Sequence, residues 1–488
     1  MRKRVISVII ITMLLLTLQS YGLEIPGYEG GIKNEMTYME VVFITGKPII
    51  MEGTLDVRIT ERNEKGTERY NYRLENIEEE AELTRTVNLS KTIVEQNGQR
   101  QEVYTVTSYK ESLEIAGVEY ETDNKSSQWS KSNIFEKKPG VTYFAGNWDG
   151  RKVYTVNDDE GKVTVETRGD VVGYNQYWGT TETQTIEHFI RFEGVGEDAI
   201  KWQGTARVEA VHNRTRDYSY ESNSPTQISF RGGFLMTQQE ENVLKVSYDL
   251  PRLADDGSLR SQRNVGLDSY SVDTNPINER LIIPSMRDIS GHGAEADILL
   301  LASLGAVPSE TTNYGPSLPI SRGDFARFIT MSMGIPIEEE EVRRRTIQTQ
   351  EEESIFVDVS TSSPNYKYIK AMAEKGVMNG TGEGRFYPNR SVTKAEVAAI
   401  VVRLLGFENL APIQNYSTGY KDDRQIPDWA KDAVYVTKEL TLIDATSDNY
   451  FQPNRDITKA EAATILTNLI HYLQKELRYD YRENIINY

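Results

Sequence analysis

The stretch Phe386-Tyr-Pro-Asn-Arg-Ser-Val-Thr-Lys-Ala-Glu396 occurs three times, in variant form, in the last two fifths of the chain. The other copies are Tyr314-Gly-Pro-Ser-Leu-Pro-Ile-Ser-Arg-Gly-Asp324 and Phe451-Gln-Pro-Asn-Arg-Asp-Ile-Thr-Lys-Ala-Glu461. They begin 72 residues before it and 65 residues after it, and they align without a gap. Each copy follows an apolar segment of helical period and an acidic turn. Three copies of one unit predict a repeat architecture.

Each copy contains the pattern of a helix start. Thr393 with Glu396 forms a capping box, in which the hydroxyl accepts from a helix amide and the acid reaches back to the cap. A basic residue follows the cap in every copy, although a cation at a helix N-terminus interacts unfavourably with the helix dipole and costs about 0.3–1 kcal/mol of stability. A basic side chain beside free helix amides suits an anion. We therefore expect an anion site, with an ordinary exposed cation as the alternative. Replacing the cation with alanine should leave the fold intact.

These residues resemble the S-layer homology (SLH) family. The second copy follows the family pattern throughout, from Phe356-Val-Asp358-Val through Gly376-Val-Met-Asn-Gly380 to Glu396. The resemblance implies an all-α helical bundle of three repeats with pseudo-threefold symmetry. It also implies binding to secondary cell-wall polysaccharide, often carrying pyruvate ketals, which holds the protein noncovalently on the bacterial surface.

The resemblance implies a set of residues that bind the wall polymer. They are Arg322, Lys394, Lys459, Asp288, Asp358, Asp422, Trp429, Gly376 and Gly380. The aspartates could instead cap turns, and Trp429 could be a core wedge rather than a platform for a sugar. The first copy has Gly293 where Trp is usual and lacks the Gly-rich loop, so its groove is the least complete.

The first part of the chain, residues 23–250, has a different period. Segments such as Val103-Tyr-Thr-Val-Thr-Ser-Tyr109 alternate with turn signals such as Asn97-Gly98, which predicts many antiparallel strands. We expect an all-β domain, either a sandwich or barrel-like, with a short helix at most over Glu75–Leu83. The fold class is thus multidomain, with all-β structure before the helical repeats.

The remaining segments complete the expected organisation. Residues 251–284 are polar and aperiodic, which predicts a linker. The repeats are expected at about 285–336, 354–407 and 418–475, with a charged linker over Ile337–Ser354 and a polar tail at 476–488.

The N-terminus predicts export. Arg2-Lys3-Arg4 precedes an apolar run, Val5–Leu18, which is too short to cross a bilayer comfortably. Together with the small residues Ser20 and Gly22, this is typical of a signal peptide at residues 1–22, with an uncleaved anchor as the alternative. The mature chain is expected to have no transmembrane segment and to be secreted, held at the cell wall by its repeats.

Composition narrows the function further. The chain has 55 basic and 73 acidic residues, for a net charge of −18, which disfavours nucleic acid as a partner. It has no cysteine, and its four histidines lack metal-ligand spacing. We therefore expect no metal site, no cofactor and no cysteine nucleophile.

The all-β part offers carboxylates but no catalytic pattern. Glu182, Glu187, Asp149 and Asp198, beside aromatics at Trp148, Tyr177 and Trp178, could in principle form a glycosidase pair. Sheet surfaces carry such residues as a rule, so we expect no catalytic residue and no enzyme. The expected role is a structural or adhesive surface module, with neighbouring surface-layer subunits as further partners. The alternatives are an SLH-anchored glycan-processing enzyme and a carbohydrate-binding protein.

Overall fold

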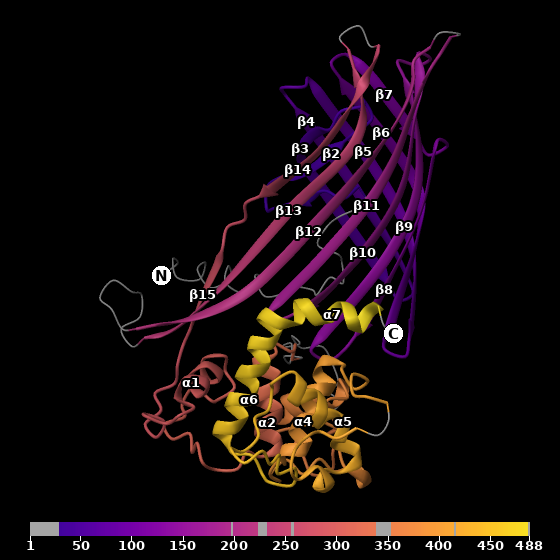
Figure 1. Ribbon diagram of the computed structural model, residues 1–488. Coiled ribbons are helices and arrows are strands. Elements are labelled where there is room, and N and C mark those ends of the chain that lie inside the picture. The colour runs from indigo at the N-terminus through magenta and orange to yellow at the C-terminus, as the bar shows by residue number, and fades with distance from the viewer. Residues whose placement is uncertain are drawn as a thin grey trace, which may run out of the picture.

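The computed structural model describes residues 29–196, 199–222, 232–254, 258–337, 353–413 and 416–486, with side chains up to residue 482. The expected signal peptide lies outside these residues, as do most of the charged linker and Asp198. Figure 1 shows a tall β-sheet standing on a smaller helical part.

The described residues up to Leu281 form one sheet of fifteen strands. Neighbours along the chain pair antiparallel, except that β7 and β8 both lie between β6 and β9, and β15 pairs with β13. Alternating inward and outward residues make these segments strands. The strands are β1 (Ile32–Lys33), β2 (Tyr38–Val42), β3 (Ile49–Arg62), β4 (Lys65–Asn76), β5 (Ala81–Gln96), β6 (Gln99–Ile115), β7 (Val118–Asp123), β8 (Ser127–Lys137), β9 (Val141–Val156), β10 (Gly161–Gln176), β11 (Gly179–Gly194), β12 (Lys201–Glu221), β13 (Gly233–Leu253), β14 (Leu259–Val272) and β15 (Ile277–Leu281).

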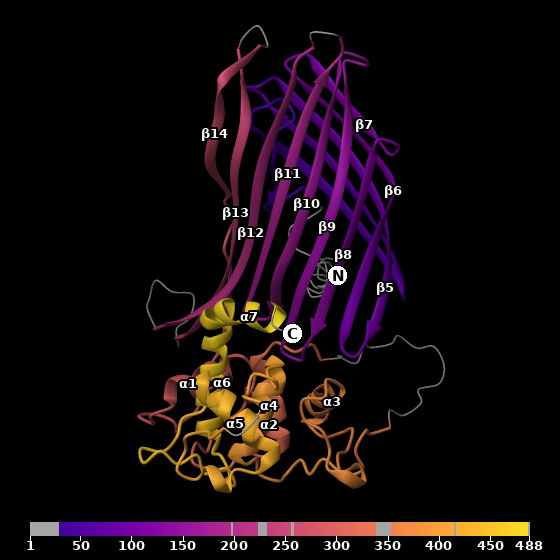
Figure 2. The same cartoon turned by 45° about the vertical axis from the view of Figure 1, so that its right-hand side comes forward.

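The sheet is strongly curved, as Figures 1 and 2 show from two sides. Its first strand, β1, lies against β12, β13 and β14. Nearby, the Asn34 Nδ2 donates a hydrogen bond of 2.7 Å to the carbonyl oxygen of Asp273. The expected β structure is therefore one curved sheet and not a sandwich of two sheets.

Two expectations for this part are wrong. Residues 251–284 are not a linker, because β14 and β15 both pair with β13 there. Glu75–Leu83 is no helix, because it contains the turn between β4 and β5, where Asn76 pairs with Ala81.

The inward face of the sheet is mostly apolar, but it also buries charged groups. Arg85 lies 2.7 Å from Glu40 and 3.0 Å from Glu111, and all three side chains are at most 2% exposed. Burial alone would favour the neutral acid, but Arg85 and Lys152 hold the pKa of Glu111 below its usual value. A buried charge is tolerated when it is paired and hydrogen-bonded. These groups tie β5 to its neighbour β6 and also to β2, which is three strands away in the sheet order.

The C-terminal part consists of short helices joined by long loops, so it is not an all-helical bundle. The α-helices are α1 (Glu295–Ser303), α2 (Arg322–Ser332), α3 (Tyr366–Glu374), α4 (Lys394–Leu405), α5 (Asp428–Glu439), α6 (Lys459–His471) and α7 (Leu477–Ile486). Two 3₁₀ turns, Gly382–Gly384 and Asp423–Gln425, and a π-helical segment, Tyr472–Glu476, complete it. The expected polar tail is thus mostly helix α7, in which Leu477 and Tyr481 are buried.

One end of the sheet shares a hydrophobic core with the helices, and the rest of the sheet has a second core of its own. At the end of the sheet that faces the helices, Trp178 is fully buried, and its indole Nε1 donates to the carbonyl oxygen of Ser332 at 2.8 Å. The Tyr143 hydroxyl donates to Leu405 O at 3.1 Å, and Gln176 Nε2 donates to Leu473 O at 3.0 Å. Helix α7 lies across this end of the sheet (Figure 2).

Candidate functional site

The repeated motif starts a helix in each repeat, as predicted. Thr393 and Thr458 form complete capping boxes with Glu396 and Glu461. Ser321 accepts from the amide of Asp324.

The three helix starts are joined in a closed ring. The amide of Ile320 donates to Ile457 O, that of Ile457 to Val392 O, and that of Val392 to Ile320 O, at 3.0, 3.0 and 3.2 Å. These residues occupy the same position of the motif in the three repeats. The repeats therefore interlock through their backbones.

The same contacts occupy the helix-start amides. The amides of Lys394 and Ala395 donate to the carbonyl oxygens of Arg455 and Pro453 at 2.9 and 3.0 Å. Equivalent pairs of bonds connect α2 to the second repeat and α6 to the first. The expected free amides are therefore absent from the first two positions of α2, α4 and α6, and an anion there would have to be bound by side chains.

The basic residues after the caps lie between repeats. Arg322 and Lys394 are buried, and Lys459 is half-buried. Arg322 donates to Phe386 O and Asn379 O at 3.0 Å each, and Lys394 donates to Asp444 O. Burial lowers the pKa of Lys394, and the nearby Arg455 lowers it further. Lys459 makes a longer bond, 3.3 Å, to Tyr314 O.

The three predicted aspartates make the same contact in each repeat. Asp358 accepts from the amides of Phe386 and Tyr387 at 2.8 and 2.7 Å, one with each carboxylate oxygen. Asp288 and Asp422 accept in the same way from Tyr314–Gly315 and Phe451–Gln452. The amides of Tyr314 and Gly315 lower the pKa of Asp288. Each aspartate thereby fixes the loop that precedes the second helix of its repeat.

The structure brings the predicted aspartates and cations together in pairs. Each aspartate accepts a hydrogen bond from the amide of an aromatic residue. The basic residue of another repeat lies over the ring of that same aromatic residue. Asp422 is paired with Lys394 through Phe451, Asp358 with Arg322 through Phe386, and Asp288 with Lys459 through Tyr314.

The other predicted site residues lie outside these pairs. Trp429, in the first turn of α5, is 62% exposed, which suits a platform better than a core wedge. Gly376 ends α3 with φ = 67°, a left-handed conformation that glycine adopts readily. Gly380 lies beside Asn379, the partner of Arg322, and a Cβ there would lie 2.6 Å from the Phe356 ring.

Sequence reasoning missed Arg390 and Arg455. Each pairs with the glutamate of the capping box, Glu396 or Glu461, and remains about two fifths exposed. The signal was present, because the motif carries Asn-Arg in the second and third copies but Ser317-Leu318 in the first. Two of the three repeat interfaces therefore hold two cations each, one that is buried and one that is about two fifths exposed.

The described carboxylates considered for catalysis are divided between the two faces of the sheet, and two of them, Asp149 and Glu187, flank Arg168 on the same face. Asp149 and Glu187 are exposed on the outer face of the sheet, whereas Glu182 is fully buried on its inner face. Two of the aromatics expected beside them, Trp148 and Trp178, are buried core residues.

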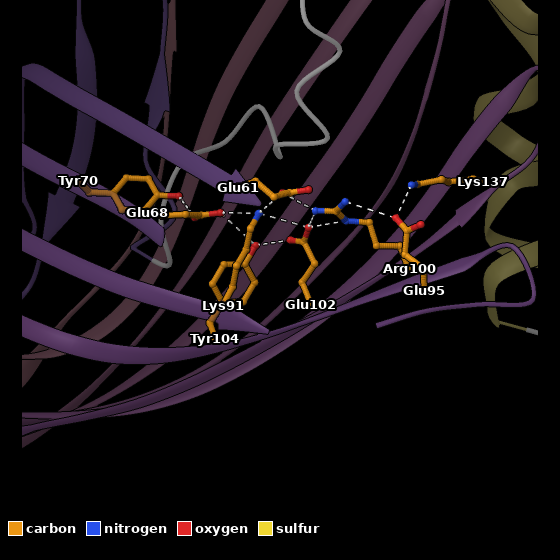
Figure 3. A network of polar contacts seen from close by, with 9 residues as sticks. All are labelled: Glu61, Glu68, Tyr70, Lys91, Glu95, Arg100, Glu102, Tyr104 and Lys137. Carbon is orange, nitrogen blue, oxygen red and sulfur yellow. Dashed lines mark hydrogen bonds and ion pairs between the residues drawn. The ribbon is translucent and has the colours of Figure 1, made fainter. Parts of the chain in front are cut away.

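A second buried network ties up further carboxylates, as Figure 3 shows. Lys91 Nζ lies 3.1 Å from Glu68 and 3.3 Å from Glu102. The Tyr104 hydroxyl donates to Glu102, and Arg100 contacts Glu61 at 2.6 Å. These contacts hold strands β3 to β6 together.

Comparison with known proteins identifies the repeats. The chain carries three S-layer homology domains, matched by the family model of that name at residues 285–326, 355–398 and 419–463. None of the described helices has the length and apolar character needed to cross a membrane.

The curated relatives share only part of their length with this chain. It is 31% identical over 106 residues to the "Surface layer protein" of Brevibacillus choshinensis, covering 22% of this chain and 9% of that protein. It is 26% identical over 178 residues to the "S-layer protein" of Bacillus licheniformis (36% and 18%). It is 28% identical over 163 residues to the "Endoglucanase" of Bacillus sp. strain KSM-635 (33% and 16%). The chain thus spans less than a fifth of these relatives, which carry different names.

Proposed function

We propose that this chain is an exported bacterial surface protein held noncovalently to secondary cell-wall polysaccharide by its three repeats. The observation that carries the proposal is the closed ring of three S-layer homology domains, with a cation from one repeat set against the next at each interface. This arrangement supports the pseudo-threefold symmetry implied by the resemblance. The sheet is the displayed module, structural or adhesive and without catalysis of its own.

The polymer-binding residues follow from the charges at the interfaces. The interface of the first and second repeats contains Arg322 and Arg390, and that of the second and third contains Lys394 and Arg455. Arg390 and Arg455 are planar donors of the kind that suits a carboxylate, such as a pyruvate ketal, which would share or replace the capping-box glutamate that each arginine contacts. The third interface has Leu318 in place of the arginine. We therefore place the acidic groups of the polymer at the first two interfaces, with Trp429 as a sugar platform.

Relatives named surface-layer proteins support a place beside neighbouring subunits in a surface layer. The relative named an endoglucanase does not favour an enzyme here. Its match covers only 33% of this chain and 16% of that protein.

Sedimentation with purified cell-wall sacculi tests the anchoring. The full chain should sediment with intact sacculi and stay in solution after acid extraction of the non-peptidoglycan polymer. The double variant Arg390→Ala/Arg455→Ala should bind at least about tenfold more weakly, the effect of losing one charge-assisted hydrogen bond. Lys367→Ala/Arg424→Ala removes the same charge from exposed positions of the helical part and should bind normally. Undiminished sedimentation after extraction would contradict the proposal.

A further inference from the structure

A groove of about 1150 Å³ crosses the outer face of the sheet from β8 to β14. Two rows of outward side chains form its walls, and the backbone of the intervening inward residues forms its floor. One wall is a cross-strand row of Ser130, Asp149, Arg168, Glu187, Arg207 and Ser247. We call this feature the outer-face groove.

The four charged groups in this wall of the groove are free to meet a ligand. Arg168 lies 3.8 Å from Asp149, and Arg207 lies 3.8 Å from Glu187, both beyond hydrogen-bond length. These four side chains are 54–81% exposed, in contrast to the buried Arg85 network with its contacts near 3 Å. Inside the sheet the charges satisfy one another, whereas in the groove their donors and acceptors face solvent.

The charge balance of the groove indicates an uncharged ligand. The first wall alternates acid and base and sums to zero. In the second wall, Arg151 lies opposite Glu166, and Asp249 pairs with Arg263. Such a surface attracts neither a polyanion nor a polycation.

The backbone floor and the second wall of the groove exclude some classes of ligand and favour others. The strands beneath the groove are paired on both sides from β9 to β13, so a peptide cannot add to the sheet there. Recognition must come from side chains. Carboxylates only accept hydrogen bonds and guanidinium groups only donate them, whereas a sugar hydroxyl does both. Phe189, opposite Glu166 and half-buried, adds an apolar ring.

The groove stays open when the repeats are on the wall. Arg168 is eight residues along β10 from Gln176, which contacts the helical part. At about 3.3 Å per residue, the groove is roughly 26 Å from that contact. Figure 1 shows the helical part confined to one end of the sheet.

We propose that the outer-face groove binds an uncharged polysaccharide chain laid across strands β8 to β14. The wall anchor and this site are then separate, one for an acidic polymer and one for a neutral glycan. The site does not depend on the anchoring proposal.

Affinity electrophoresis of the full chain tests this site. The gels contain mixed-linkage β-glucan, xylan or starch as neutral probes, and polygalacturonate as a charged comparison. Retardation by at least one neutral probe is expected. The variants Arg168→Ala/Glu187→Ala and Phe189→Ala should lose at least about tenfold in affinity, as expected for one charge-assisted hydrogen bond or a stacking ring.

A matched control lies on the same two strands. Lys162→Ala/Glu193→Ala removes an exposed, directly opposed pair of charges from β10 and β11 outside the groove. It should bind like the unmodified chain, and all variants should keep the same circular dichroism spectrum and binding to sacculi. The proposal is overturned if no neutral probe retards the chain, if the groove variants bind normally, or if polygalacturonate is preferred.

Discussion

The ammonium group of Lys394 in the second repeat lies 4.9 Å from the centroid of the Phe451 ring in the third. Arg322 covers Phe386 at 4.7 Å, and Lys459 covers Tyr314 at 5.9 Å, which closes the cycle. A cation over an aromatic face is an attractive contact, stronger when water is excluded. The unfavourable interaction of each basic residue with the dipole of its own helix is thus offset by its contact with an aromatic ring of the neighbouring repeat.

Lys394→Ala should therefore destabilise the fold, contrary to what the helix dipole alone suggests. The variant loses the ring contact and the bond to Asp444 O, but it no longer has to bury a charge. The net decrease in the free energy of unfolding is expected to be about 1–3 kcal/mol. Lys459→Ala should cost less, because Lys459 is half-buried and its contacts are longer. Urea unfolding measures both, and Lys394→Met separates the ammonium contacts from the packing of the stem. A midpoint for Lys394→Ala at or above that of the unmodified chain would contradict the role of this residue as a tie.

The three aspartates should differ in their contribution to stability, although their hydrogen bonds are alike. Asp422 is 4% exposed, Asp358 is half-buried, and Asp288 is exposed. Removing the carboxylate leaves two backbone amides without an acceptor, and this costs more stability where water cannot reach the amides. Replacement by alanine should cost about 2–4 kcal/mol at Asp422, less at Asp358 and least at Asp288. Thermal melts of the three variants give the order, and an equal or reversed order would show that burial does not control the cost.

The repeats could be predicted from the sequence because one pattern occurs three times with its caps. The ring of backbone bonds could not, because it joins residues 65 to 137 positions apart. Arg390 and Arg455 were overlooked although the Asn-Arg pair recurs in the second and third copies, because a polar pair in a turn is usually explained by solvation alone.

The sheet was predicted from its period, but its last strands were not. Edge strand β14 places Val265 and Leu267 on its outer face, 71% and 78% exposed, among Ser, Asn and Asp residues. An edge strand need not carry the inward apolar alternation that marks central strands. This is why residues 251–284 resembled a linker.

Acid should weaken the sheet through His188. Burial lowers the pKa of His188 to about 4, from 6.5 in a solvated histidine. Between these values the unfolded chain binds a proton that the folded chain does not, so stability falls as pH decreases. The expected loss between pH 7 and pH 5 is about 2 kcal/mol.

His188→Gln can retain the hydrogen bond to Thr167, which is 3.0 Å long in the native protein, without titrating. Its unfolding midpoint in urea should therefore depend less on pH between 7 and 5 than that of the native chain. The half-buried His292, which lies outside the sheet and accepts a hydrogen bond from the amide of Ala294, provides the control His292→Gln. If both variants keep the native pH dependence, other groups are responsible.

The shared core changes what an isolated anchor should do. From the sequence, residues 285–475 should suffice for wall attachment. In the structure, this fragment lacks α7, and it exposes the surface that Trp178 and Tyr143 cover. We expect fragment 285–488 to melt at a higher temperature than fragment 285–475, and both to melt below the helical part of the full chain.

Trp178→Ala in the full chain should reproduce part of this loss, about 3–5 kcal/mol for a buried tryptophan. Phe189→Ala, at a half-buried position on the outer face of the sheet, should cost less. Equal melting temperatures for the two fragments and the full chain would mean that the sheet and the anchor are independent units.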